Sequence, residues 1–221
     1  MAINLRSTSE VHTNGIKMLV YGAAGAGKTH LIQTLPNPVI LSAESGLLTL
    51  QGKDIPYIQI TNMEELREAY TWAVSDECKF DSICLDSISE IAEVVLNTEK
   101  KKASDPRQAY GAMQEQVSDI IRAFRDIPGK HVYFSAKQEK TQDDMGRIIY
   151  GPMMPGKQIG QQIPYQFDMV FALRVEKDSE GNAVRALLCE RDGLWEAKNR
   201  GGKLDTWEAP DLGEIIRKVS L

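Results

Sequence analysis

The octapeptide at residues 22–29, Gly22-Ala23-Ala24-Gly25-Ala26-Gly27-Lys28-Thr29, decides the fold. It fits the pattern G-x-x-x-x-G-K-[ST], follows the apolar run at residues 17–21 and opens a helical pattern. Glycines allow successive backbone N–H groups to point at phosphate oxygens, and the start of the helix adds its positive end. We therefore predict that residues 22–30, ending at His30, bind ATP, with Lys28 on the β- and γ-phosphates and the Thr29 hydroxyl on Mg²⁺. The alternative, an incidental Gly/Ala-rich turn, does not account for the flanking strand and helix patterns.

The rest of the chain alternates short apolar runs with helical patterns, which is typical of βαβ units around a mostly parallel sheet. The expected strands are Ile16 to Tyr21, Val39 to Ala43, Ser82 to Asp86, His131 to Ala136, Met169 to Val175 and Val184 to Cys189. The expected helices are Lys28 to Leu35, Met63 to Val74, Ser87 to Asn97, Arg107 to Arg125 and Leu212 to Val219. The second helix follows Asn62, with Glu65 three residues on, in a capping-box arrangement. The sequence thus predicts an α/β fold with helices flanking a mostly parallel sheet, in one domain spanning residues 1–221.

Two stretches do not fit this alternation. Asn97 to Arg107 carries three lysines and a proline, and we expect an exposed loop there. Lys137 to Pro164 is rich in Pro and Gly and contains an Asp143-Asp144-Met145-Gly146 turn. We expect a mobile hairpin and loop across the top of the sheet, because long loops in compact domains are usually functional or disordered.

Two acidic residues end expected strands. Asp86 closes the apolar run that starts at Phe80, where a carboxylate can hold Mg²⁺ through water; Asp86 is also well placed to cap the next helix. Glu44 lies at the tip of the strand that follows the first helix, at the edge where open parallel sheets bind ligands. Hydrolysis needs a base that orients water, and Glu44 is the best-placed candidate, with a surface loop glutamate as the alternative.

The glycine-rich loop, the strand ending Ala43-Glu44-Ser45-Gly46-Leu47 and the strand ending Leu85-Asp86-Ser87 together resemble the ATPase core of RecA-type recombinases. The pattern is similar to that of small phage ATPases of the Sak-four group, which assist single-strand annealing and recombination. The resemblance runs from Ile16 to Gly202, and it implies a RecA-like P-loop fold in which Glu44 activates water. The family's polar sensor near Ser135 is ambiguous, since Ser135, Lys137 and Gln138 could each align.

The resemblance also implies two DNA-binding loops. One matches residues 97–110, and the other matches residues 137–164. Single-strand binding combines cations that follow the phosphates with planar groups that stack on bases. The candidate residues are Lys100, Lys101, Lys102, Arg107, Lys137, Lys140, Arg147, Tyr150, Lys157 and Tyr165. Lys100 to Lys102 alone would read as a solvated charge run.

A late segment, Trp195 to Gly202, can form a short strand ending in a glycine turn, with Lys198 and Arg200 on one face. RecA-type helicases such as the DnaB group carry a similar K-x-R-x-G segment that reaches the γ-phosphate of the neighbouring subunit. The resemblance therefore implies a homo-oligomer, ring or filament, in which Lys198 and Arg200 act in trans. The alternative is a basic hairpin on the surface.

Composition sets outer bounds. The 221 residues are 42% hydrophobic and 26% charged, with no apolar run of membrane-spanning length and no signal pattern at the start. Cys78, Cys84 and Cys189 lack metal-ligand spacing, so we expect core thiols in a reducing cytoplasm. A net charge of −5 excludes a uniformly basic nucleic-acid coat but leaves basic loops possible.

The function expected from these features is a single-stranded-DNA-dependent ATPase in phage recombination, with single-stranded DNA and a single-strand-binding protein as partners. The sequence lacks the N-terminal polymerisation segment and C-terminal domain of full-length recombinases, so we expect annealing rather than strand exchange by a stable filament. A helicase-type motor or loader ATPase is the alternative. A small-molecule kinase is a further alternative, although Arg147 is the single arginine of the long loop.

Overall fold

The computed structural model describes residues 15–44, 46–143 and 145–220. Its centre is a 10-stranded sheet in the order β10-β8-β7-β1-β5-β4-β2-β3, with β6 paired to β5 and β9 paired to β7. The strands are β1 (Lys17–Gly22), β2 (Pro38–Ser42), β3 (Tyr57–Gln59), β4 (Ser82–Asp86), β5 (His131–Gln142), β6 (Ile148–Pro152), β7 (Met169–Lys177), β8 (Ala183–Leu188), β9 (Lys198–Asn199) and β10 (Trp207–Glu208). From β7 to β3 every neighbouring pair is parallel, whereas β6, β8, β9 and β10 pair antiparallel. The predicted α/β fold with a mostly parallel sheet is confirmed.

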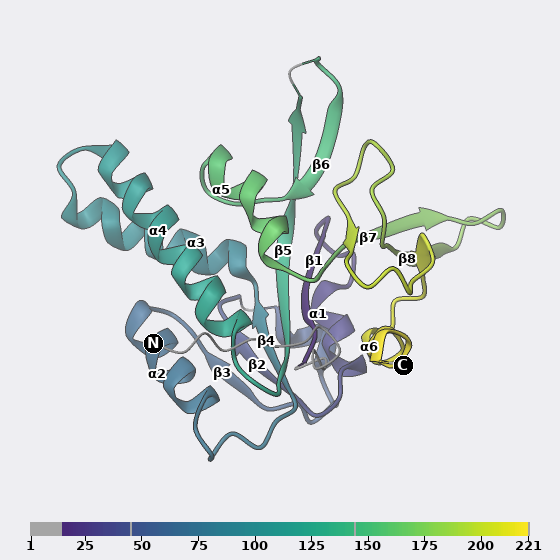
Figure 1. The fold of residues 1–221 in the computed structure, drawn as a ribbon, viewed down its shortest axis with the longest axis horizontal. Coiled ribbons are helices and arrows are strands. Elements are labelled where there is room, and N and C mark those ends of the chain that lie inside the picture. The colour runs from purple at the N-terminus through teal and green to yellow at the C-terminus, as the bar shows by residue number, and fades with distance from the viewer. Residues whose placement is uncertain (1–14, 45, 144, 221) are drawn as a thin grey trace, which may run out of the picture.

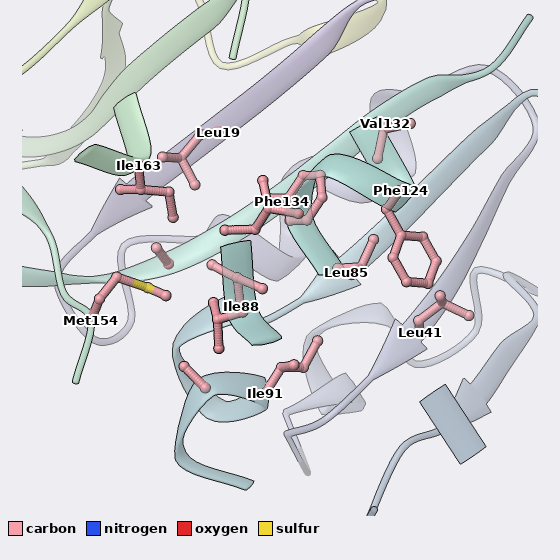
Figure 2. Packing of buried hydrophobic residues seen from close by; sticks show 14 of the residues in the cluster. Leu19, Leu41, Leu85, Ile88, Ile91, Phe124, Val132, Phe134, Met154 and Ile163 are labelled. Carbon is pink, nitrogen blue, oxygen red and sulfur yellow. The ribbon is translucent and has the colours of Figure 1, made fainter. Parts of the chain in front are cut away.

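Helices cover both faces of the sheet (Figure 1). They are α1 (Lys28–Leu31), α2 (Met63–Ala73), α3 (Ile88–Lys102), α4 (Pro106–Arg125), α5 (Lys157–Gln162) and α6 (Leu212–Ser220). One core cluster joins α2, α3, α4 and α5 to one face, and a second joins α1 and α6 to the other. In the first cluster Phe134 meets Phe167 edge to face, with ring centroids 4.9 Å apart; Figure 2 shows Phe134 among Leu19, Leu85 and Ile163. Burial on both faces explains why the parallel strands read as continuous apolar runs.

The expected exposed loop from Asn97 to Arg107 is wrong. Helix α3 continues through Lys102, and α4 begins at Pro106 with Asp105 as its N-cap. Lysine is a good helix former, and cations are favoured in the last turn because the helix C-terminus is negative. The lysine run therefore extends the helix, and residues 103–105 make the connection.

The segment from Lys137 onward is a hairpin, as expected, but a more regular one. Strand β5 runs past Ala136 to Gln142 and pairs with β6. At the turn, Asp143 Oδ1 accepts hydrogen bonds from the N–H groups of Met145 and Arg147; Asp144 lies outside the described residues. In Figure 1 this hairpin projects well beyond the sheet. Within the described residues, no helix is both long and apolar enough to cross a membrane.

Of three smaller expectations, two change and one is confirmed. The first helix is shorter than predicted, since it gives way to a 3₁₀ turn at Ile32. Asn62 accepts from the Glu65 N–H, as the capping box predicts, and the Glu65 carboxylate interacts with the backbone N–H groups of both Thr61 and Asn62. Ser87, not Asp86, caps α3, which leaves the Asp86 carboxylate free for another role.

Candidate active site

The glycine-rich loop emerges from β1 at the carboxyl edge of the sheet. Gly25 and Gly27 adopt φ of 74° and 108°, a left-handed conformation that strongly favours glycine. Within the described part of the chain, the N–H groups of Gly25, Gly27, Lys28 and Thr29 have no protein partner. Successive N–H groups without partners, on residues that alternate between right- and left-handed conformations, form a concave anion-binding site. The loop thus fits a phosphate group.

The Lys28 side chain folds back over this loop. Its Nζ donates to the carbonyl oxygens of Gly22 at 2.9 Å and Ala23 at 3.1 Å. Burial lowers the pKa of Lys28, while the carboxylates of Glu44 and Asp86 oppose that shift. The ammonium is therefore close to both acidic residues but hydrogen-bonded to carbonyls, and an incoming anion can replace those carbonyls.

Asp86 is the polar centre of the site. It is buried, and its Oδ2 accepts a 2.7 Å hydrogen bond from the Thr29 hydroxyl, while its Oδ1 accepts from Ser135. Burial raises the pKa of Asp86, and these two hydrogen bonds counteract that rise because they favour the carboxylate. Of the three sensor candidates, Ser135 is the one that contacts Asp86; Lys137 forms an ion pair with Glu90 of α3 instead.

Glu44, which follows the end of β2, enters the same site. The Ser42 hydroxyl donates to the Glu44 carbonyl at 2.6 Å, and the Ser87 hydroxyl donates to Glu44 Oε1 at 2.5 Å. The Glu44 charge contributes to the raised pKa of Asp86 and opposes the lowering of the Lys28 pKa. The structure thus brings together the predicted set Lys28, Thr29, Asp86 and Glu44, and Ser135 and Ser87 lie beside it.

The donor set fits magnesium rather than a metal held by the protein alone. Within the described residues there is no group of three or more His, Cys, Asp and Glu side chains that could hold a metal ion. Magnesium is usually bound by one or two carboxylates together with substrate phosphates and water. Thr29 and Asp86, adjacent at one end of the phosphate loop, are the side chains suited to that role.

Sequence reasoning missed three residues around the loop. Ser87 orients Glu44, and its only sequence signal is that it directly follows Asp86. The Tyr133 hydroxyl donates to the Lys28 carbonyl at 2.8 Å, and Arg185 Nε donates to the Ala26 carbonyl at 3.0 Å. Neither Tyr133 nor Arg185 carries a local pattern that could have revealed this contact.

Lys198 and Arg200 lie apart from these residues. Strand β9 pairs with the first residues of β7, at the sheet edge opposite the phosphate loop. Lys198 Nζ donates to the carbonyl oxygens of Pro164 and Phe167, and Arg200 pairs with Asp168 at 2.9 Å. Neither side chain joins the nucleotide site of its own chain.

The cations expected to bind DNA divide into two groups. Lys100, Lys101 and Lys102 form the last turn of α3; Lys102 pairs with Glu99, and Lys100 lies over the Tyr110 ring. Arg107 is exposed at the start of α4.

The second group lies on and after the β5–β6 hairpin. Lys140 and Tyr165 are exposed, and Arg147 pairs with Asp143. Tyr150 instead stacks on Trp195, with centroids 4.2 Å apart, so its ring is engaged within the protein. Lys157 is the first residue of α5, and the structure describes its backbone but not its side chain.

Comparison with known proteins identifies the family of this chain. The family model described as "AAA domain" matches residues 14–201, which is most of the chain. The chain belongs to this AAA domain family. No curated protein matches it.

Two solved structures are similar to this chain. The first is the KaiC-like protein PH0186 from Pyrococcus horikoshii OT3, with 13% identity over 80% of this chain and 79% of that chain, and a TM-score of 0.45. The second is an ATPase from the type III secretion system of pathogenic bacteria, with 14% identity over 72% of this chain and a TM-score of 0.51. The match spans about half of the secretion ATPase, 51% of its chain. At such identities the likeness concerns the fold, which is the RecA-like P-loop ATPase fold.

Proposed function

We propose that this chain hydrolyses ATP in response to single-stranded DNA and acts in recombination by single-strand annealing, as the phage Sak-four group does. One observation carries the ATPase part of the proposal. Asp86 binds Thr29 of the phosphate loop and Ser135 of β5, while the adjacent Ser87 holds Glu44 at 2.5 Å. A phosphate loop, a metal-binding carboxylate and a water-orienting carboxylate thereby meet at one edge of the sheet.

Each residue has a chemical task in this proposal. Lys28 and the unpaired loop amides would bind the phosphates, and Thr29 and Asp86 would hold Mg²⁺, which would supply positive charge beside the phosphates. Glu44 accepts a hydrogen bond from the attacking water and orients it. Ser87 keeps the Glu44 carboxylate in position, because Oε1 is engaged and Oε2 remains available.

The β5–β6 hairpin supports the DNA part of the proposal. Strand β5 runs without interruption from Ser135, which donates to Asp86, to Lys140 in the exposed hairpin. A change at the nucleotide site can thus reach the hairpin along one strand. Exposed cations such as Lys140 and Arg147, with the exposed ring of Tyr165, suit the phosphates and bases of a single strand.

The proposal includes partners. We infer a homo-oligomer in which Arg200, with Lys198 beside it, reaches the nucleotide of a neighbouring copy, since these residues lie away from their own site. Lys198 is already committed to two carbonyl oxygens, so Arg200 is the stronger candidate. A single-strand-binding protein would supply the covered DNA on which annealing acts.

The test measures ATP turnover with no DNA, with single-stranded DNA and with duplex, together with the salt dependence of DNA binding. Single-stranded DNA should stimulate turnover. The double variant Lys140→Gln and Arg147→Gln should flatten the plot of log affinity against log salt by about 0.7 for each lost phosphate contact. The triple variant Lys100→Gln, Lys101→Gln and Lys102→Gln tests in the same way whether the C-terminal end of α3 contacts DNA phosphates.

If neither variant alters the salt slope, the DNA surface is elsewhere. Turnover that ignores single-stranded DNA contradicts the proposed function. Processive unwinding of duplex would instead favour a helicase-type motor.

A further inference from the structure

A second cation reaches the phosphate loop from the β7–β8 hairpin. Strands β1 and β7 are in register at Tyr21 and Ala172, and Arg185 stands opposite Val175, beyond the end of β1. The hairpin therefore continues past the loop, and Arg185 Nε donates to the Ala26 carbonyl at 3.0 Å. A methyl group added at Gly27 would lie 3.6 Å from Arg185 Nε and 3.7 Å from its Cδ. The Arg185 side chain thus packs directly on the loop.

The charge of Arg185 is uncompensated within the described part of the chain. Its side chain makes one hydrogen bond there, from Nε to a neutral carbonyl, and it forms no ion pair. Arg174 on the partner strand differs, since it pairs with Glu176 at 2.5 Å and lies over the Trp195 ring. Arg185 is exposed and lies against a loop whose amides are unpaired and which carries Lys28. Glu44 and Asp86 act on Lys28, but no carboxylate pairs with Arg185 among the described residues, so the Arg185 side of the loop favours an anion.

The order of the strands indicates which part of a nucleotide Arg185 meets. Asp86 on β4 and Glu44 after β2 lie on one side of β1, while β7 and β8 lie on the other. The metal-binding and water-orienting groups need the terminal phosphate on the β4 side. A nucleotide bound in this way would present to Arg185, on the opposite side, the phosphates nearer the nucleoside.

We propose that Arg185 is a phosphate ligand acting within its own chain, on the α- and β-phosphates that ATP and ADP share. This rests on the proposed ATPase function of the same site. Nε keeps its bond to Ala26, and the two Nη groups donate to phosphate oxygens. Arg185 therefore raises the affinity for both nucleotides alike and leaves the chemical step unchanged.

The experiment measures equilibrium binding of Mg·ATP and Mg·ADP by calorimetry, and turnover at saturating ATP, for Arg185→Gln and Arg185→Lys. Glutamine can still donate to the Ala26 carbonyl but carries no charge. We expect Arg185→Gln to weaken both Kd values by about tenfold, with kcat unchanged, because a charge-assisted hydrogen bond is lost. Arg185→Lys, which keeps the charge, should recover part of the affinity. Arg174→Gln is the matched control, and it should bind like the wild type.

The salt dependence of the affinity distinguishes phosphate binding by Arg185 from a purely structural role in supporting the loop. The affinity gap between wild type and Arg185→Gln should narrow from about 50 mM to about 500 mM salt, since screening weakens exposed charges. Unchanged Kd values in Arg185→Gln, equal losses in the Gln and Lys variants, or a loss of ATP but not ADP affinity would each overturn the inference. A wild type that binds neither nucleotide would instead refute the proposed function, so the two failures are distinguishable.

Discussion

Replacing Glu44 by glutamine isolates its proposed role as the base. Glutamine has the same shape, and its amide oxygen can accept the Ser87 hydroxyl as Oε1 does at 2.5 Å. The residue should therefore stay in place while its charge and basicity are lost. Loss of a general base slows turnover by about 10²–10⁴-fold, equivalent to about 3–5 kcal/mol on the barrier. Removing an anion beside the phosphate loop should leave ATP affinity equal to that of the wild type or slightly tighter.

The assay compares phosphate release at saturating ATP with equilibrium binding of the nucleotide. Glu64→Gln, an exposed carboxylate in the first turn of α2, is the control and should leave turnover unchanged. Turnover of Glu44→Gln within about twofold of the wild type would place the base elsewhere. A parallel fall in binding would show that Glu44 organises the site rather than activating water.

Three further predictions concern charge, assembly and packing. Burial lowers the pKa of Lys17 to about 8 from its ordinary 10.5, so between these values the unfolded chain binds more protons than the folded one. Raising the pH from about 7.5 to about 10.5 should therefore increase the free energy of unfolding of the wild type, relative to Lys17→Met, by about 2–3 kcal/mol in urea unfolding. A difference between the two proteins that does not change with pH would exclude the pKa shift. Arg200→Ala should bind ATP but turn it over about 10³–10⁵-fold more slowly. Mixing it with Lys28→Ala protein, which keeps Arg200, should restore activity. Absence of rescue would exclude the action in trans, and so would equal inactivity of the control Asp168→Asn, which removes the ion-pair partner of Arg200. Tyr21→Phe should lower the free energy of unfolding by about 1–3 kcal/mol in urea, because the single proton of the buried hydroxyl is shared between two carbonyl oxygens, at 3.1 Å and 2.7 Å. An unchanged midpoint would contradict this.

The central strands and the phosphate loop were predictable because their signals are local. A buried parallel strand reads as an apolar run, and the loop between β1 and α1 requires glycine at the positive φ of Gly25 and Gly27. Asp86 and Glu44 follow from the same logic, since the carboxyl ends of parallel strands meet at one edge. What the sequence could not supply was the pairing of side chains from distant strands, such as Ser135 with Asp86 or Arg185 with Ala26.

The errors have equally specific causes. A run of lysines and a proline suggested a loop, but Lys100 to Lys102 end a helix, and Pro106 starts the next one, where its missing N–H costs nothing. The sequence predicts a strand only as far as Ala136, because the later residues of β5 are polar. Those residues pair in a hairpin outside the core, where backbone hydrogen bonds define a strand without an apolar pattern.

The most direct test of the account is the binding of Mg·ATP to wild type and Lys28→Ala by calorimetry, with circular dichroism as a check on the fold. The Lys28 side chain is half-buried and belongs to neither hydrophobic core cluster, so its removal should leave the fold intact. The account predicts one nucleotide per wild-type chain and a loss of affinity of about 100-fold or more in the variant. A folded Lys28→Ala protein that binds ATP as the wild type does would contradict the nucleotide site itself.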